Sequence, residues 1–298
     1  MPVKIYNSLA GKIEEEAVCA EGLMKFLYGS NPAGSLALWA LFRRAFFSKI
    51  CGVWAKSKTS KKYALKFIEK NNIDVSEMFK KPEEFSCFND FFTRELKFGA
   101  RPVSQDPLDI SFPADGRHLA FENLSAKNSF YIKNREFKLA EFLGSESLAK
   151  RFEQGAMMIS RLSPADYHRF HWGVSGIVAA RKKIGGSLYS VSPIALRKNL
   201  DYLLQNKRVL TLVELGGGAM CATVEIGATN VGSIVELDNL GDAVSRGECR
   251  GYFNFGGSCI VTIFEKGSVK FNADILKYSA EPVEYYALAN QTCGKLLK

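Results

Sequence analysis

The sequence predicts an α+β fold, with helices at the N-terminal side followed by a mainly antiparallel β core. Residues from about Glu14 to Asn71 have a helical pattern, whereas short β-rich runs separated by glycine follow Arg101-Pro102. Such runs without regular intervening helices favour an antiparallel barrel or sandwich. At 298 residues and 47% hydrophobic, the chain can bury a substantial core as one large domain or a domain with a helical extension.

We expect a helical N-terminal region over residues 1–100. Asn31-Pro32-Ala33-Gly34 predicts a break in the first helical stretch, and Asn71-Asn72 predicts its end. A second helical region is expected from Asp74 to Leu96. Four phenylalanines recur in it at spacings of three and four, which is typical of core positions: Phe85, Phe88, Phe91 and Phe92.

Residues 101–298 are expected to form the β-rich domain. One helical patch is expected around residues 139–152. The strands are expected near residues 156–159, 176–180, 209–213, 222–226, 231–237 and 259–264.

The charge is unevenly distributed. Lys+Arg 40 against Asp+Glu 31 gives a formal charge of +9, which suggests an acidic partner. From Gly22 to Ile68 there is no Asp or Glu, while nine Lys and Arg side chains alternate with large apolar ones. This pattern predicts a segment that lies on an anionic membrane. A core helix with a basic solvent face is the alternative, and no recognisable nucleic-acid module is present.

The same segment is not expected to cross the membrane. The uncharged stretch from Leu27 to Phe42 contains Gly29, Ser30, Asn31 and Pro32, and Arg43-Arg44 ends it short of the ~20 apolar residues that a spanning helix needs. The first residues, with Glu14-Glu15-Glu16, lack the basic start and apolar core of a secretory signal. Seven cysteines without a Cys-x-x-Cys pair fit reduced thiols better than disulfides or a zinc site. We therefore expect a peripheral protein on the cytoplasmic face of the cell membrane.

Four motifs occur together in the remaining sequence. The most C-terminal is Phe255-Gly256-Gly257-Ser258, ahead of an apolar run that predicts a buried strand; alone, it indicates only a turn. Upstream are Pro113-Ala114-Asp115-Gly116-Arg117, the segment from Ser163 to His171 (SPADYHRFH), and Phe91-Phe92-Thr93-Arg94-Glu95-Leu96-Lys97. Together, from about Phe88 to about Phe264, they resemble the phosphatidylserine decarboxylase family.

The resemblance implies a barrel-sandwich β core and a proenzyme that cuts itself between Gly257 and Ser258. Chains 1–257 and 258–298 would stay together as a heterodimer, with further oligomerisation left open, and Ser258 would become a pyruvoyl group. That group would form a Schiff base with phosphatidylserine and release CO2 to give phosphatidylethanolamine, with no metal and no other cofactor. The commoner family sequence at the cut is Leu-Gly-Ser-Thr; here Gly256 and Cys259 replace the leucine and the threonine.

Self-cleavage needs a base, because a serine hydroxyl is a poor nucleophile until its proton is removed. With the family resemblance, Asp115, His171 and Ser258 are expected to form the self-cleavage triad, in which Asp115 orients His171 and His171 deprotonates Ser258. Without the resemblance, Asp115-Gly116 is better interpreted as a hairpin turn. His168 is the candidate proton donor for decarboxylation, provided that the stretch bends, since residues three apart on a strand face opposite sides.

Several roles and functions remain open at this point. Arg94 can pair with a core carboxylate, which we favour, or with a lipid phosphate. We expect His118 to be structural, and the segments 191–196 and 227–232 can line the site. The alternative functions are a non-processing lipid-binding relative and a decarboxylase of another serine-headgroup lipid. A serine hydrolase lacks support because no Gly-x-Ser-x-Gly elbow surrounds Ser258.

Overall fold

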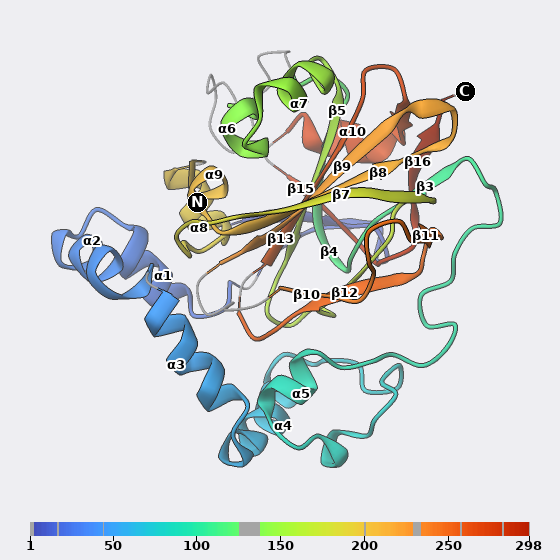
Figure 1. Cartoon of the computed structure of the whole chain (residues 1–298). Helices are drawn as coiled ribbons and strands as arrows, with labels where there is room; N and C mark the ends of the chain where they lie inside the picture. Colours follow the sequence, from blue (N-terminus) through green and yellow to red (C-terminus); the bar gives the residue numbers. More distant parts are fainter. Residues whose placement is uncertain are drawn as a thin grey trace.

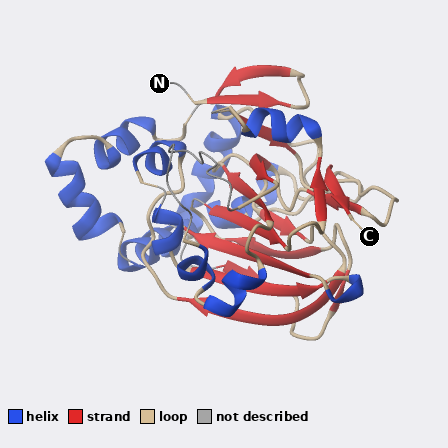
Figure 2. Cartoon of the chain, turned by 90° about the horizontal axis from the view of Figure 1, so that it is seen from above, coloured by secondary structure: helices blue, strands red, loops and turns tan. Residues whose placement is uncertain are grey.

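The computed structural model describes residues 3–16, 18–43, 45–124, 138–199, 201–228, 234–256, 258–281 and 283–297. Many of the helices lie to the left of the strands when the molecule is seen from above, and others lie above and below them (Figure 2). The α-helices are α1 (Glu21–Tyr28), α2 (Pro32–Ala37), α3 (Ala45–Ala55), α4 (Lys61–Lys70), α5 (Phe88–Phe92), α6 (Leu139–Leu143), α7 (Glu146–Arg151), α8 (Pro193–Lys198), α9 (Asp201–Gln205) and α10 (Ala273–Ser279). Short helical turns of other types are η1 (Leu38–Phe42), η2 (Lys58–Ser60), η3 (Pro82–Glu84) and η4 (Gly216–Gly218).

The largest sheet has ten strands within the described residues, in the order β11-β7-β8-β9-β13-β5-β4-β15-β1-β2. Its strands are β1 (Lys4–Asn7), β2 (Lys12–Glu15), β4 (Gly116–Phe121), β5 (Ala156–Leu162), β7 (Gly176–Ile184), β8 (Arg208–Glu214), β9 (Met220–Gly227), β11 (Ala243–Val244), β13 (Ser258–Phe264) and β15 (Glu284–Ala287). Neighbours pair antiparallel except β1 and β15, which run parallel.

Two three-stranded sheets complete the β structure of the described ranges, β10-β12-β6 and β14-β16-β3. Their strands are β3 (Asp109–Ser111), β6 (Arg169–His171), β10 (Ile234–Glu236), β12 (Cys249–Phe253), β14 (Val269–Phe271) and β16 (Thr292–Leu296). The predicted α+β class and the mainly antiparallel core are confirmed. The barrel-sandwich description is loose, because the sheets formed by the described residues do not close into barrels.

Strand β13 lies in the middle of the large sheet, between β9 and β5, and all seven of its residues are buried. Cys259, Val261 and Ile263 pack into the cluster that includes α8 and α9, while Phe264 packs into the cluster on β14 and α10. Because side chains alternate between the two faces of a strand, a strand covered on both faces is apolar throughout. This explains the continuous apolar run, and the buried strand predicted there is confirmed.

The predicted helical patch at 139–152 and the strands near 156, 176, 209 and 222 are confirmed by α6, α7, β5, β7, β8 and β9. Of the run at 231–237, β10 covers Ile234–Glu236, and residues 229–233 lie outside the described part of the chain.

Two helix predictions near the N-terminus are wrong. Lys12–Glu15 is strand β2, paired with β1, and helix begins only at Glu21. Strand β1 in turn joins β15, so backbone pairing with a distant strand outweighs the local helical pattern. Between Asp74 and Leu96 the described helices are only η3 and α5. The four phenylalanines are nevertheless buried as predicted, in one cluster with Ala64 and Ile68 of α4.

Helices α1, α2 and α3 project from the β structure, and α3 runs toward α4 and α5 (Figure 1). The predicted break at 31–34 is confirmed, since Asn31 caps α2, and α4 ends at Lys70 as predicted. Large apolar side chains are exposed along these helices: Leu23, Phe26, Leu36, Trp39, Leu41, Phe46, Ile50, Val53 and Trp54. In the described part of the chain, no helix combines the length and the apolar character needed to cross a membrane.

Candidate active site

Three neighbouring strands of the large sheet bring the predicted site residues to one end. Ser258, the first residue of β13, lies opposite Leu162, the last residue of β5. Gly116, the first residue of β4, is so close to β5 that a Cβ on it would lie 2.5 Å from the Arg161 carbonyl oxygen. Asp115, the loop after Leu162 and Ser258 therefore meet at the same end of the sheet. The hairpin alternative for Asp115-Gly116 is wrong, because β3 and β4 belong to different sheets.

Ser258 is fully buried, and its Oγ has no hydrogen-bond partner among the described residues. Both sides of its strand are fixed, by Leu162 on β5 and Gly227 on β9. Gly256 has φ 146°, a conformation that side-chain-bearing residues rarely adopt, so glycine suits this position of the loop. Gly257, the other half of the predicted cleavage site, lies outside the described residues.

His168 lies in the loop between β5 and β6, so the bend that the prediction required is present. Its Nδ1 is 2.9 Å from the Asp166 carbonyl oxygen and must therefore donate the hydrogen. The buried Nε2 then carries a lone pair and has no partner in the described ranges. The ring packs on Phe92 at a centroid distance of 3.8 Å. Burial lowers the pKa of His168 to about 3, which keeps the imidazole neutral near pH 7.

His171 is held in the same tautomer by a different carbonyl. Its Nδ1 lies 2.9 Å from the Gly247 oxygen, and its buried Nε2 has no partner within the described chain. Burial lowers the pKa of His171, and the Gly247 carbonyl and the charge of Asp115 offset part of that effect. His171 Nε2 is therefore a proton acceptor at neutral pH.

Asp115 bonds to an arginine and a backbone amide, not to His171. Arg101 donates to both carboxylate oxygens, Nε to Oδ1 at 2.8 Å and Nη2 to Oδ2 at 2.6 Å, and the Ala289 amide donates to Oδ1 at 2.8 Å. The structure thus orients His171 through Gly247, and Asp115 acts on it by charge. The described residues show no hydrogen bond linking Asp115, His171 and Ser258 into a chain.

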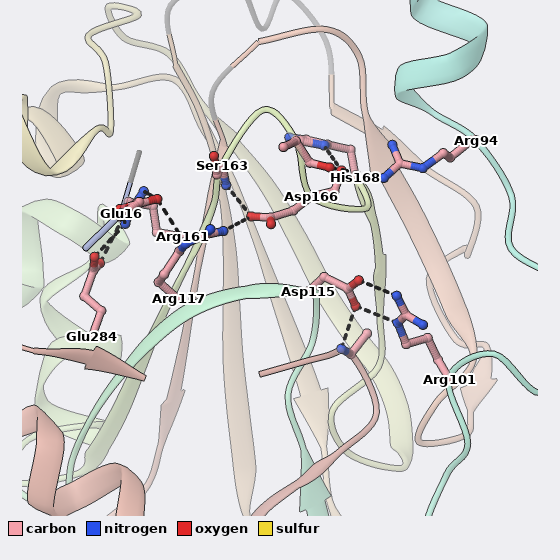
Figure 3. A network of polar contacts seen from close by, with 12 residues as sticks. Glu16, Arg94, Arg101, Asp115, Arg117, Arg161, Ser163, Asp166, His168 and Glu284 are labelled. Carbon is pink, nitrogen blue, oxygen red and sulfur yellow. Dashed lines mark hydrogen bonds and ion pairs between the residues drawn. The ribbon is translucent and has the colours of Figure 1, made fainter. Parts of the chain in front are cut away.

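A buried network of charges fixes the loop that carries His168 (Figure 3). Asp166 accepts a 2.6 Å bond from the Ser163 amide and pairs with Arg117. Arg117 also pairs with Glu16, at 3.0 Å. Glu16 and Glu284 both pair with Arg161, at 2.6 and 2.5 Å. Each buried charge has an opposite neighbour, as burial requires. Asp166 therefore has the local structural role expected from the sequence.

The loop before Ser258 is held by α5. Asn89 Nδ2 donates to Asn254 Oδ1 at 2.8 Å, and Asn89 Oδ1 accepts from the Phe255 amide at 2.9 Å. The Phe255 ring packs against Phe88 and Phe92, with centroids at 4.9 and 5.3 Å. The residues just before the predicted cut are therefore anchored to the N-terminal helical region.

The sequence did not indicate Arg101, Asn89 or Gly247 as parts of the site. The one sequence feature that could have indicated Asn89 is its position as an amide among phenylalanines. Arg101 was noted only because Arg101-Pro102 marks the start of the β-rich region. Gly247 acts through its backbone carbonyl, and the residue type does not reveal such a role.

Two other predictions can be compared with the structure. His118 is structural, as expected, with Nδ1 2.9 Å from Ser160 Oγ. The favoured carboxylate partner of Arg94 is wrong, since no such ion pair occurs in the described residues.

The segment 191–196 contains the start of α8, and its Val191, Ala195 and Leu196 belong to the core cluster that also includes Cys259, the residue after Ser258. Of the segment 227–232, residues 229–232 lie outside the described chain. All seven cysteines are free. The described ranges contain no cluster of three or more His, Cys, Asp or Glu arranged for a metal ion.

Comparison with known proteins places these motifs in a family. Residues 88–285 match the sequence profile described as phosphatidylserine decarboxylase. A phosphatidylserine decarboxylase proenzyme of Fusobacterium nucleatum is 41% identical over 92% of this chain and 91% of its own. Proenzymes of the same name from Chlamydia trachomatis (36% identical, 97% and 96% covered) and Clostridium beijerinckii (35%, 98% and 98%) are also similar.

Proposed function

The chain belongs to the phosphatidylserine decarboxylase family, and on that premise we propose that it is a self-cleaving phosphatidylserine decarboxylase that produces phosphatidylethanolamine. Membership of this family by itself makes the chain a decarboxylase of the lyase class. The alternatives of a non-processing lipid-binding protein and of a different serine-headgroup substrate are not favoured, because the similar relatives named above are phosphatidylserine decarboxylase proenzymes.

One observation carries the finer proposal. A buried, unpartnered serine hydroxyl begins β13, and two neutral imidazoles, each with an unpartnered Nε2, lie in the loop and strand that follow β5, the neighbour of β13. Buried polar atoms normally have hydrogen-bond partners. Nε2 of the structural His118 also lacks one, so the missing partners alone do not mark the reacting groups. What distinguishes His168 and His171 is that they follow β5, the strand whose end lies opposite Ser258, where such atoms could exchange protons during a reaction.

In self-cleavage, His171 Nε2 would take the Ser258 hydroxyl proton as the Oγ attacks the Gly257 carbonyl carbon. The amide becomes an ester and the Ser258 nitrogen is protonated. Loss of the Ser258 Cα proton then expels the Gly257 carboxylate and leaves dehydroalanine, which water converts to a pyruvoyl group and ammonia. Asp115 would stabilise the imidazolium by its charge at the moment that His171 is protonated.

The pyruvoyl group would supply an electrophilic carbonyl and an electron sink for the departing CO2. The residues present fit it, because its position is a buried strand end, and His168 contacts the segment just before it: its carbonyl accepts from the Phe253 amide at 3.0 Å, and Phe92 packs on both its ring and Phe255. His168 Nε2 would accept the proton that the substrate ammonium must lose and return it to the carbon that has lost CO2. A neutral imidazole with a free Nε2 suits this order of events, accepting first and donating second.

The two chains would remain associated after the cut. Residues 258–298 supply β13 and β15 to the large sheet and β14 and β16 to a small one. Seven residues of β13 pair with β5 and the same seven pair with β9, so a break before Ser258 leaves both ladders intact.

Peripheral attachment to the cytoplasmic face of an anionic membrane is the remaining part of the proposal, with residues 1–100 as the associating region. Its support is the exposed apolar row on α1 to α3 within a segment that has no acidic residue. Apolar burial would add to attraction of about 1 kcal/mol per basic residue near the surface, which salt weakens.

The function is tested by the intact mass and carbonyl reactivity of the purified protein. We expect two chains, the smaller starting at position 258 with a ketone at its N-terminus, and CO2 release from phosphatidylserine vesicles. Ser258→Ala should remain one chain of 33.1 kDa without a carbonyl. A cut in that variant, or an uncut wild type that lacks a carbonyl, would refute the proposal.

Membrane attachment is tested by co-sedimentation with phosphatidylserine-containing vesicles. Leu36→Ser combined with Phe46→Ser removes two of the most exposed apolar side chains from α2 and α3 and should weaken binding. Leu240→Ser, an equally exposed leucine in the loop before β11, is the matched control and should bind as wild type does. Equal vesicle binding by wild type, the double variant and Leu240→Ser would contradict membrane attachment through these helices.

A further inference from the structure

Arg94 is a buried cation that forms no salt bridge in the described chain, although the charges of Asp115 and Asp166 act on it at longer range. Its side chain is 6% exposed, and its guanidinium carbon lies 4.9 Å from the centre of the Phe91 ring. Nη2 donates one long bond, 3.3 Å, to the Ala165 carbonyl, whereas Nε and Nη1 have no partner. Burial lowers the pKa of Arg94 to about 10, which still leaves it charged at neutral pH.

The other buried arginines of the described residues show what is normally required. Arg161 pairs with two carboxylates, and Arg250 pairs with Glu225 at 2.9 Å and stacks on Trp172. Arg208 has no carboxylate, but its donors reach the four carbonyls of Phe142, Leu204, Asn206 and Glu141. A buried charge is costly unless it is paired or saturated with hydrogen bonds. Arg94 differs from all three in retaining two free donors.

Those donors lie beside the candidate active site. Arg94 follows α5, which packs against His168 through Phe92 and holds the loop before Ser258 through Asn89. Its side chain points toward His168 (Figure 3), and its one bond goes to the loop between β5 and β6 that carries His168. An anion that fills the coordination of Arg94 would therefore lie within the same site.

The serine headgroup offers two anions, the carboxylate and the phosphodiester. The carboxylate loses its charge as it leaves as CO2, so a guanidinium bound to it would stabilise the ground state more than the transition state and would slow the reaction. The phosphodiester keeps its charge throughout, so pairing with it costs nothing in the chemical step. Arginine also presents paired donors that match two phosphate oxygens.

We propose that Arg94 binds the phosphodiester of the lipid headgroup and so positions the serine moiety against Ser258 and His168. This inference rests on the proposed function. It makes Arg94 a substrate-binding residue, and it predicts that the product headgroup, which has the phosphodiester but no carboxylate, binds through the same contact.

The test compares Arg94→Met with wild type and with Arg181→Met. Arg181 is the matched control, an ion-paired arginine on β7 that contacts Glu236 and Asp238. Each protein is first checked for its two chains and its carbonyl, and glycerophosphoethanolamine is then titrated into the matured enzyme by calorimetry. Loss of a hydrogen-bonded charge should raise the Kd of Arg94→Met about 10- to 100-fold. The KM for phosphatidylserine in detergent micelles should rise similarly, with a smaller change in kcat, and Arg181→Met should match wild type in both.

Three results would overturn the inference. The first is an unchanged Kd for glycerophosphoethanolamine in Arg94→Met, and the second is an equal loss of affinity in Arg181→Met. The third is weaker binding of the serine headgroup by Arg94→Met with unchanged binding of glycerophosphoethanolamine, which would assign Arg94 to the carboxylate. If Arg94→Met does not mature, Arg94→Lys keeps the charge but not the paired donors and should raise the Kd about 3- to 10-fold; wild-type affinity there overturns the paired contact. Failure of the proposed function would appear separately, as a wild type without a cut or a carbonyl.

Discussion

Asn89→Ala isolates the contact that holds the loop before the predicted cut. The substitution removes the 2.8 Å bond to Asn254 and the 2.9 Å bond from the Phe255 amide, and it leaves the side chains of Phe88 and Phe92 in place. Attack on the Gly257 carbonyl needs that loop in one arrangement relative to Ser258. We therefore expect slower self-cleavage from a chain that still folds.

The size of the effect follows from the two bonds. At about 1 kcal/mol for each hydrogen bond, their loss amounts to about 2 kcal/mol. If the whole amount is needed to restore the loop before attack, the rate of self-cleavage falls about 30-fold. Stability of the fold is expected to fall by no more than the same ~2 kcal/mol, because α5 keeps its buried aromatic face.

Cell-free synthesis followed by a chase measures the rate, since the precursor and the two product chains separate on a denaturing gel. Asp90→Ala is the matched control: Asp90 is the next residue of α5, but its bonds go to Lys80 and Ser86, not to the loop before Ser258. We expect Asp90→Ala to cleave at close to the wild-type rate. Wild-type cleavage by Asn89→Ala, or equal slowing in both variants, would refute a positioning role for Asn89.

Three further predictions concern the site and its support. Because burial lowers the pKa of His171, this base stays unprotonated at pH values below the ordinary histidine range. The chase should therefore show an undiminished cleavage rate from pH 8 to below about 6.5. A decrease in the cleavage rate centred at about pH 6.5 would contradict this. His118 has a pKa of about 3 when folded and about 6.5 when unfolded, so the unfolded state binds the extra proton and stability is lost as pH falls from 6.5 toward 3, at up to about 1.4 kcal/mol per pH unit. His118→Asn in the uncut Ser258→Ala background should remove this share and make the pH dependence of urea-unfolding stability less steep, while His168 and His171 keep theirs. An unchanged slope would count against it. Gly116→Ala places a Cβ 2.5 Å from the Arg161 oxygen and should lower the free energy of unfolding by about 1–3 kcal/mol and slow maturation, whereas Gly185→Ala, with open space around it, should not.

The sequence predicted the central strands because their apolar character is local and continuous. Residues 259–264 and 156–159 are buried on both faces of the sheet, so each forms an almost uninterrupted apolar run that is visible in the sequence. The wrong predictions have the opposite origin. Lys12–Glu15 is a strand because β1 pairs with β15, a partner some 280 positions away, and the segment from Asp74 to Leu96 is held by the aromatic cluster with little helix of its own.

The candidate site also has features that the sequence predicts and features that it does not. Asp115, His168, His171 and Ser258 could be proposed from motifs, because their chemistry is in the side chains. The atoms that set their states could not, since the tautomers of His168 and His171 are fixed by the backbone carbonyls of residues 166 and 247. For Arg94 the sequence predicts a carboxylate partner, because a single arginine among aromatic residues usually has one. The structure instead leaves Nε and Nη1 without a partner in the described residues.

The N-terminal region links the proposed membrane surface to the reaction centre. Trp54, on the exposed apolar row of α3, packs against Phe88 of α5 and against Phe255 in the loop before the cut, with centroids at 6.1 and 6.4 Å. The same short helix α5 leads directly into Arg94 and places Phe92 on His168. A lipid drawn to α3 would therefore meet Arg94, the proposed phosphodiester-binding residue, and His168, the proposed proton carrier, on one continuous support. After the cut, that support would still hold the new end of the long chain through Asn89, so maturation would leave the route from membrane to site in place.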